Sequence, residues 1–129
     1  IVLRLALAAA ASALIGYERE ETKHAAGLRT HMLVCIGSTL ITLTSLEMFP
    51  NDPARVAAGI VTGIGFLGAG TIFRDKNNVR GLTTAASIWA VAGVGLALGT
   101  GAYFIAAAAT IAMLLTLELG RITSSLKRR

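Results

Sequence analysis

Long apolar stretches alternate along the chain with short polar connections. Apolar residues run almost without a break over 1–16, 32–49, 56–73, 82–98 and 103–119. Each stretch is close to the lower limit of the roughly 17–25 residues that a helix needs to cross a hydrocarbon core. None alternates polar and apolar residues as a barrel strand does. Because a backbone in lipid must satisfy its own hydrogen bonds, the pattern predicts an all-α membrane protein, a bundle of five short transmembrane helices.

The polar connections carry turn and helix-end signals. Pro50 and Pro53 lie between the second and third stretches, where proline suits the first turn of a helix but not its interior. Gly99 and Gly101 suit a tight reversal before the last helix. The segment 74–81 is expected to be a polar loop.

Composition excludes several classes of protein. Hydrophobic residues make up 54% of the chain and charged residues 15%, against roughly 25% charged in soluble domains. The single cysteine, Cys35, excludes a disulfide within the chain. The sequence offers no phosphate loop and no pairing of a nucleophile with a base, so we expect neither an enzyme nor a resident cofactor.

Lysine and arginine divide unequally between the two ends of the predicted helices. Arg4 and Arg55 fall at one end. Ten residues fall at the other: Arg19, Lys23, Arg29, Arg74, Lys76, Arg80, Arg121, Lys127, Arg128 and Arg129. The positive-inside rule then predicts an N-terminus outside and a C-terminus in the cytoplasm. This bias accounts for the formal net charge of +5, so no nucleic-acid partner is expected.

Glycines are dense in the third apolar stretch. The run from Gly63 to Gly68 fits the dinucleotide pattern G-x-G-x-x-G, but it lacks the preceding strand that such a site requires. Helical spacing favours packing instead, with the third helix at the centre of the bundle and its neighbours close against it. The predicted packing residues are Gly59, Gly63, Gly65, Gly68 and Gly70. Local unwinding that exposes carbonyls to an ion is the minor alternative.

Charged and hydroxyl residues gather at the predicted cytoplasmic ends of the helices. Candidate functional residues there are Glu18, Arg19, Glu20, Arg29, Thr30, His31, Arg74, Asp75, Arg80, Thr83 and Thr84. Converging carboxylates could bind a hard cation such as Mg²⁺. Most of the acids have a basic neighbour, however, which favours a layer of salt bridges and headgroup contacts that anchors the helix ends.

These residues also carry a family resemblance. The sequence resembles the MgtC/SapB family of bacterial inner-membrane proteins through four motifs in the family's order. They are Gly16-Tyr-Glu-Arg-Glu20, Ala26-Gly-Leu-Arg-Thr-His-Met32, Gly63-Ile-Gly-Phe-Leu-Gly-Ala-Gly70 and Val79-Arg-Gly-Leu-Thr-Thr-Ala-Ala86. Many members continue into a soluble C-terminal domain, and we expect that domain to be absent here because the chain ends ten residues after Leu119.

The resemblance implies a function as well as a fold. Members are associated with growth under magnesium limitation and with survival of pathogens inside macrophages. The resemblance implies a regulator that restrains the ATP synthase or contacts a membrane histidine kinase or a P-type magnesium pump. We therefore expect a non-catalytic regulator, a homodimer in the bilayer. The alternative is a small transporter or channel for magnesium or another cation, and whether Mg²⁺ binds is left open.

Overall fold

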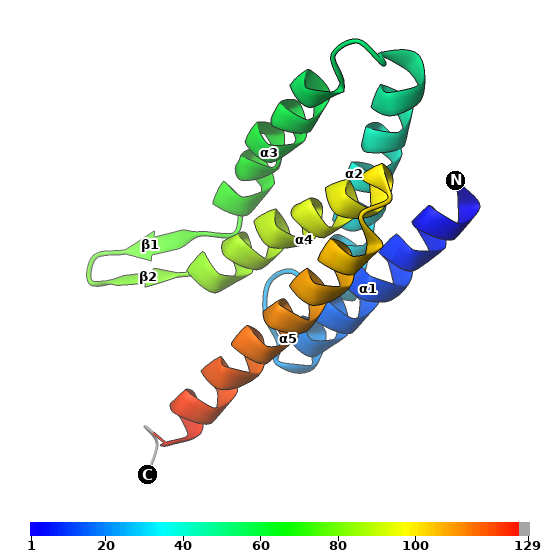
Figure 1. Cartoon of the computed structure of the whole chain (residues 1–129). Coiled ribbons are helices and arrows are strands. Elements are labelled where there is room, and N and C mark those ends of the chain that lie inside the picture. The colour runs from blue at the N-terminus through cyan, green and yellow to red at the C-terminus, as the bar shows by residue number, and fades with distance from the viewer. Residues whose placement is uncertain (127–129) are drawn as a thin grey trace.

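The computed structural model describes residues 1–126 and contains five α-helices and one β-hairpin (Figure 1). The elements are α1 (Val2–Glu21), α2 (Leu28–Met48), α3 (Pro53–Ala69), β1 (Phe73–Asp75), β2 (Asn78–Arg80), α4 (Leu82–Thr100) and α5 (Tyr103–Leu126). The predicted all-α architecture of five helices is confirmed. Lys127, Arg128 and Arg129, which the charge count included, lie outside the described residues.

Three of the five helices are long and apolar enough to cross a membrane: α2, α4, and α5 over Tyr103–Thr123. The other two fall short for different reasons. The apolar helix α3 has only 17 residues. The helix α1 carries Arg4 near its start and four consecutive charged residues at its end, 18–21.

Several predicted helix ends and one predicted loop are wrong. The helix α2 begins at Leu28, four residues before the predicted start at 32, and α5 runs to Leu126, seven residues past the predicted end at 119. The helix α1 continues through the charged residues to Glu21, because glutamate and arginine are good helix formers. The helix α3 stops at Ala69, four residues before the predicted end at Phe73. The expected polar loop is instead the antiparallel hairpin, in which Phe73 pairs with Arg80 and Asp75 with Asn78.

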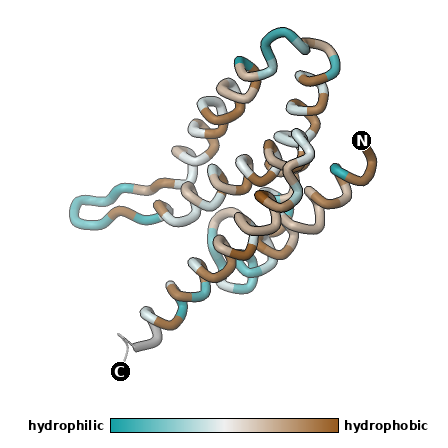
Figure 2. Tube along the Cα trace, in the orientation of Figure 1, coloured by the Kyte–Doolittle hydropathy of each residue, from teal (hydrophilic) through white to brown (hydrophobic). Residues whose placement is uncertain are grey.

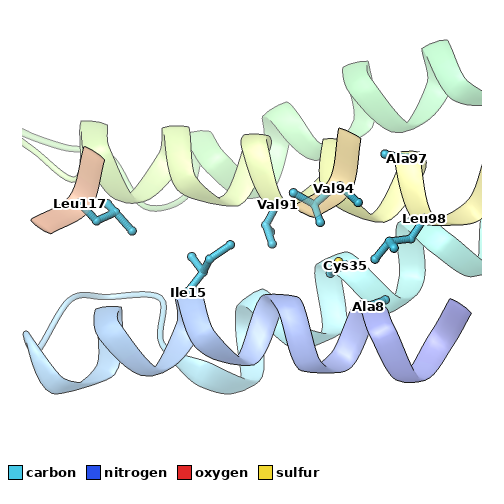
Figure 3. Packing of buried hydrophobic residues seen from close by; sticks show 9 residues of the cluster. Ala8, Ile15, Cys35, Val91, Val94, Ala97, Leu98 and Leu117 are labelled. Atoms are coloured by element: carbon cyan, nitrogen blue, oxygen red, sulfur yellow. The ribbon is translucent and has the colours of Figure 1, made fainter. Parts of the chain in front are cut away.

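The core of the bundle surrounds α4, which packs against α1, α2, α3 and α5 (Figure 1). Ile15 of α1 and Cys35 of α2 meet Val91, Val94 and Leu98 of α4 there (Figure 3). The prediction that the third helix is central is therefore wrong: α3 has one buried residue, Gly68, and lies at the edge of the bundle.

Hydroxyl groups of α2 bind directly to the backbone of α4. Ser38 Oγ donates to the carbonyl oxygen of Ala92 at 2.6 Å, and Thr39 Oγ1 donates to that of Gly95 at 2.9 Å. Bonds between helices of this kind are typical of membrane bundles, where apolar side chains meet lipid as favourably as they meet each other. They fix the register of α2 against α4.

A second contact ties α1 to the turn between α4 and α5. Arg4 donates from Nη1 to the carbonyl oxygen of Gly99 at 2.6 Å and from Nε to the Tyr103 hydroxyl at 3.2 Å. The turn itself depends on Gly101, whose φ of +85° is left-handed, as at many helix C-termini. Gly101 thus makes the predicted tight reversal.

Hydrophilic residues concentrate at the hairpin and in the helix connections, while the helices are mostly apolar along their length (Figure 2). The hairpin and the ends of α1 and α5 lie at the same end of the bundle as the starts of α2 and α4 (Figure 1). We call this the basic end, because it holds Arg19, Lys23, Arg29, Arg74, Lys76, Arg80 and Arg121.

Candidate functional site

Arg19 projects from the last turns of α1 into the bundle. Its side chain keeps 4% of its surface exposed, and Nη2 donates to Thr84 Oγ1 of α4 at 3.2 Å. Nη1 lies 3.7 Å from Glu18 Oε2, which is an ion pair but too long for a hydrogen bond. Two of the predicted site residues, Arg19 and Thr84, thus form a buried connection between helices far apart in sequence.

Glu18 and Arg19 have unmet hydrogen-bonding capacity. Both carboxylate oxygens of Glu18 and Nε of Arg19 are buried without a hydrogen-bond partner among the described residues. The Glu18 side chain keeps 11% of its surface exposed. Burying a charged group without hydrogen bonds is costly, so these three atoms mark a position that a further group would stabilise.

His31 continues the buried cluster from α2. Its ring is fully buried, with Nδ1 2.9 Å from the carbonyl oxygen of Gly27 and Nε2 3.0 Å from Ser87 Oγ. Because a carbonyl only accepts, Nδ1 carries a proton. Ser87 Oγ also lies 2.8 Å from the carbonyl oxygen of Thr84. Through Arg19, Thr84, Ser87 and His31, one polar cluster joins α1, α2 and α4 inside the basic end.

Glu20 has a separate role at the start of α2. Its Oε2 accepts a hydrogen bond of 2.7 Å from the backbone N–H of Leu28, the first residue of that helix. Gly16 lies against the same place, since a Cβ there would sit 2.7 Å from Leu28 Cα. The carboxylate accepts from an N–H that has no carbonyl partner within the helix. Its negative charge also interacts favourably with the positive end of the α2 dipole.

Replacing Glu20 with alanine is therefore expected to lower the free energy of unfolding by about 1 kcal/mol, the usual cost of losing a helix cap. Denaturation in detergent monitored by circular dichroism measures this loss. Glu21→Ala is the matched control, because Glu21 is exposed and no cap bond involves it. Equal losses in the two variants would contradict the capping role.

The remaining predicted residues lie on the surface. Arg74, Asp75 and Arg80 are exposed on the hairpin, where Asp75 Oδ1 accepts from the backbone N–H of Lys76 at 2.7 Å. Arg29 is exposed and Thr30 half-buried in the first turn of α2, and Thr83 is exposed in the first turn of α4. The structure therefore separates the predicted polar layer into a buried cluster, a helix cap and an exposed hairpin.

The predicted carboxylates do not converge within the described chain. Glu18 faces the bundle, Glu20 caps α2, and Asp75 lies in the hairpin. No group of three or more histidine, cysteine, aspartate or glutamate side chains that could hold a metal ion occurs among residues 1–126. Residues 1–126 of one chain thus hold no ready cluster of acidic ligands for a divalent cation.

Only some of the predicted packing glycines lie against another helix of the chain. A Cβ at Gly59, Gly63 or Gly65 would meet nothing within 4 Å, so these positions contact no neighbouring helix among residues 1–126. Gly68 does approach Ala85 of α4, at 3.5 Å to its carbonyl oxygen. A Cβ at Gly70 would meet only the preceding turn of the chain, Phe66 and Leu67.

Three other glycines, which were not among the predicted packing residues, approach a neighbouring helix closely. Gly16 faces Leu28, Gly95 faces Cys35 and Ser38, and Gly99 faces Thr42, with a Cβ at Gly99 only 2.7 Å from Thr42 Cγ2. The signal for Gly95 and Gly99 in the sequence is that small residues and hydroxyls occur on two apolar helices, α4 and α2, that turn out to be neighbours.

Burial and the charge of Arg19 set the protonation of His24, which lies beside the buried cluster. His24, in the connection after α1, accepts or donates through Nδ1 at 2.7 Å from Thr22 Oγ1. Burial lowers the pKa of His24, and the nearby Arg19 charge lowers that pKa further. His24 is therefore neutral at pH 7 and adds no positive charge beside Glu18.

Comparisons with known proteins agree on one family. The model of the MgtC family matches residues 5–126. Protein MgtC of Salmonella typhimurium (strain LT2) is 50% identical over 113 residues, which are 88% of this chain and 49% of that protein. Protein MgtC of Brucella abortus is 52% identical over 99 residues, 76% of this chain and 42% of that protein.

A differently named relative is similar over a comparable length. The putative magnesium transporter YhiD of Escherichia coli (strain K12) is 42% identical over 127 residues, 92% of this chain and 59% of that protein. The chain thus spans about half the length of the curated relatives it matches. No solved structure matches it significantly.

Proposed function

This chain belongs to the MgtC family, and on that premise we propose that it is a non-catalytic regulator in the bacterial inner membrane. The regulator responds to magnesium limitation and supports survival inside host cells. It acts as a homodimer by contacting larger membrane complexes, such as the ATP synthase, a P-type magnesium pump or a histidine kinase. The basic end faces the cytoplasm in this proposal, in keeping with the positive-inside rule.

The observation that carries the proposal is the open glycine surface of α3. A groove of about 360 Å³ lies between α2, α3 and α4, with Gly37, Gly59 and Gly63 among its lining residues. A Cβ at any of these three glycines would meet nothing within 4 Å. Small residues let helix backbones approach each other closely in lipid, so this groove suits an apolar helix of another protein.

The arrangement of carboxylates supports a regulator over a transporter. A cation pathway needs acidic or carbonyl ligands that converge along it. Glu18, Glu20 and Asp75 have three separate roles, and the Arg19 guanidinium lies beside the buried Glu18 carboxylate. Its positive charge opposes entry of Mg²⁺.

Magnesium transport is the second candidate, for two reasons. One relative is named a putative magnesium transporter. Within the described part of the chain, no hydrogen-bond donor reaches the two buried oxygens of Glu18, and a carboxylate in a membrane bundle is a standard candidate for an ion site. A pathway formed between two copies of the chain would supply the ligands that one copy lacks.

Filling the groove tests the regulator proposal. We expect Gly63→Leu to fold normally and to abolish recovery of partner complexes after cross-linking in membranes, together with the effect on growth at low magnesium. Gly65→Leu is the matched control, because Gly65 is on the same helix, is equally unobstructed, and is not among the groove residues. Partner recovery and growth unchanged in Gly63→Leu would contradict the proposal.

A further inference from the structure

A cavity of about 410 Å³ with a mixed polar and apolar lining opens at the basic end between α1, α4 and α5. Glu18, Arg19 and Thr22 line it from the α1 side, Thr83 from α4 and Arg121 from α5. Arg121 also pairs with Glu118 at 3.1 Å on the surface. The cavity therefore combines one buried carboxylate with two guanidinium groups and the ring of His24.

The unmet groups in this cavity are complementary to a ligand that carries both a positive and a negative charge. The two Glu18 oxygens accept hydrogen bonds and receive none, while Nε of the 96%-buried Arg19 side chain donates and has no acceptor among the described residues. A bare cation would satisfy Glu18 but be repelled by Arg19. A simple anion would satisfy Arg19 but be repelled by Glu18. An ammonium group joined to a phosphate satisfies both.

An apolar groove continues from the cavity along the bundle. It has a volume of about 250 Å³ and shares Thr83, Thr116 and Leu117 with the cavity. From there it runs between α4 and α5 past Ala86 and Ala112. Both helices are apolar enough to cross a membrane, so the groove lies at the level of lipid chains while the cavity lies at the helix ends.

We propose that the cavity and the groove together bind one phospholipid whose headgroup carries a primary ammonium as well as a phosphate. The ammonium donates to the Glu18 carboxylate, the phosphate accepts from Arg19 and Arg121, and an acyl chain lies in the groove between α4 and α5. This site does not depend on the regulator proposal, since it concerns the bilayer and not a protein partner.

Lipid competition on the purified full chain tests the site. Native mass spectrometry or thermal-shift titration compares phosphatidylethanolamine with phosphatidylcholine and phosphatidylglycerol, all with the same acyl chains. Phosphatidylcholine keeps the headgroup charges but has no N–H donor, and phosphatidylglycerol has no cation. We expect phosphatidylethanolamine to bind roughly tenfold more tightly than either, the usual worth of a charged hydrogen bond.

Two variants distinguish the contribution of the lipid headgroup from that of the acyl chain. Glu18→Gln is expected to abolish the preference for phosphatidylethanolamine, while Glu47→Gln preserves it, because Glu47 is exposed at the opposite end of α2. Ala86→Leu is expected to weaken all three lipids alike by filling the groove. It also keeps the test decisive if Glu18→Gln fails to fold.

Three results would overturn the proposal of a phospholipid site. The first is equal binding of the three lipids to the unaltered protein. The second is a preference that survives Glu18→Gln. The third is soluble phosphoethanolamine competing as strongly as the intact lipid, since the groove would then contribute nothing. Loss of partner recovery in Gly63→Leu bears on none of these, so the two proposals fail separately.

Discussion

Replacing Arg19 with alanine is expected to lower the free energy of unfolding by about 3 kcal/mol, the low end of the cost of removing one partner of a buried ion pair. The substitution removes the bond to Thr84 and leaves the Glu18 carboxylate buried without its neighbouring positive charge. It also opens a void where a nearly fully buried side chain joined α1 to α4.

Reversible unfolding in mixed detergent micelles measures this loss. Arg74→Ala is the control at an exposed position of the same basic end, and we expect it to change stability by no more than about 0.5 kcal/mol. The double variant Glu18→Gln, Arg19→Met is expected to recover part of the loss, because both charges are then gone. A loss in Arg19→Ala no larger than that in Arg74→Ala would show that the cluster does not hold the helices together.

The second large effect is expected at Gly95, in the contact between α2 and α4. A Cβ there would overlap the backbone carbonyl oxygen of Cys35 and lie 2.8 Å from Ser38 Cβ. Backbone atoms cannot rotate away, so Gly95→Ala forces the two helices apart and disturbs the bond from Thr39 to the Gly95 carbonyl. We expect a loss of about 2 kcal/mol, typical of overpacking in a close-packed interior.

Gly93 supplies a matched control on the same helix. A Cβ at Gly93 would meet nothing within 4 Å, so Gly93→Ala is expected to be neutral or slightly stabilising through helix propensity. The same unfolding measurement applies to both variants. If the two substitutions cost the same, the packing of α2 on α4 described above would be incorrect.

The helices could be predicted from the sequence because apolar runs of this length leave a membrane-embedded backbone few alternatives. Their ends were harder to place. The charged residues after Gly16 suit either a loop or a helical turn, and in the structure they continue α1 to Glu21, with Arg19 bonded to Thr84 of α4. The hairpin was missed because strands of three exposed residues have no alternation of polar and apolar positions long enough to detect.

The residues of the site could be predicted from the sequence, but their contacts could not. His31, Arg19 and Thr84 could be selected because polar residues on apolar helices stand out against their surroundings. Their connection could not be predicted, since it depends on which helices are neighbours. The glycines were predicted only in part for that reason too: Gly68 does approach α4, but the closest helix contacts within the chain are at Gly16, Gly95 and Gly99, and they depend on which helices are neighbours.

Flux of magnesium into liposomes tests the central claim, that the protein regulates other membrane complexes and conducts no ion itself. Purified protein would be reconstituted into liposomes that enclose a magnesium-sensitive dye, with Glu18→Gln reconstituted alongside and folding checked by circular dichroism. The regulator proposal predicts uptake equal to that of protein-free liposomes for both proteins. Saturable uptake by the unaltered protein that Glu18→Gln abolishes would contradict it and identify Glu18 as part of a transport pathway.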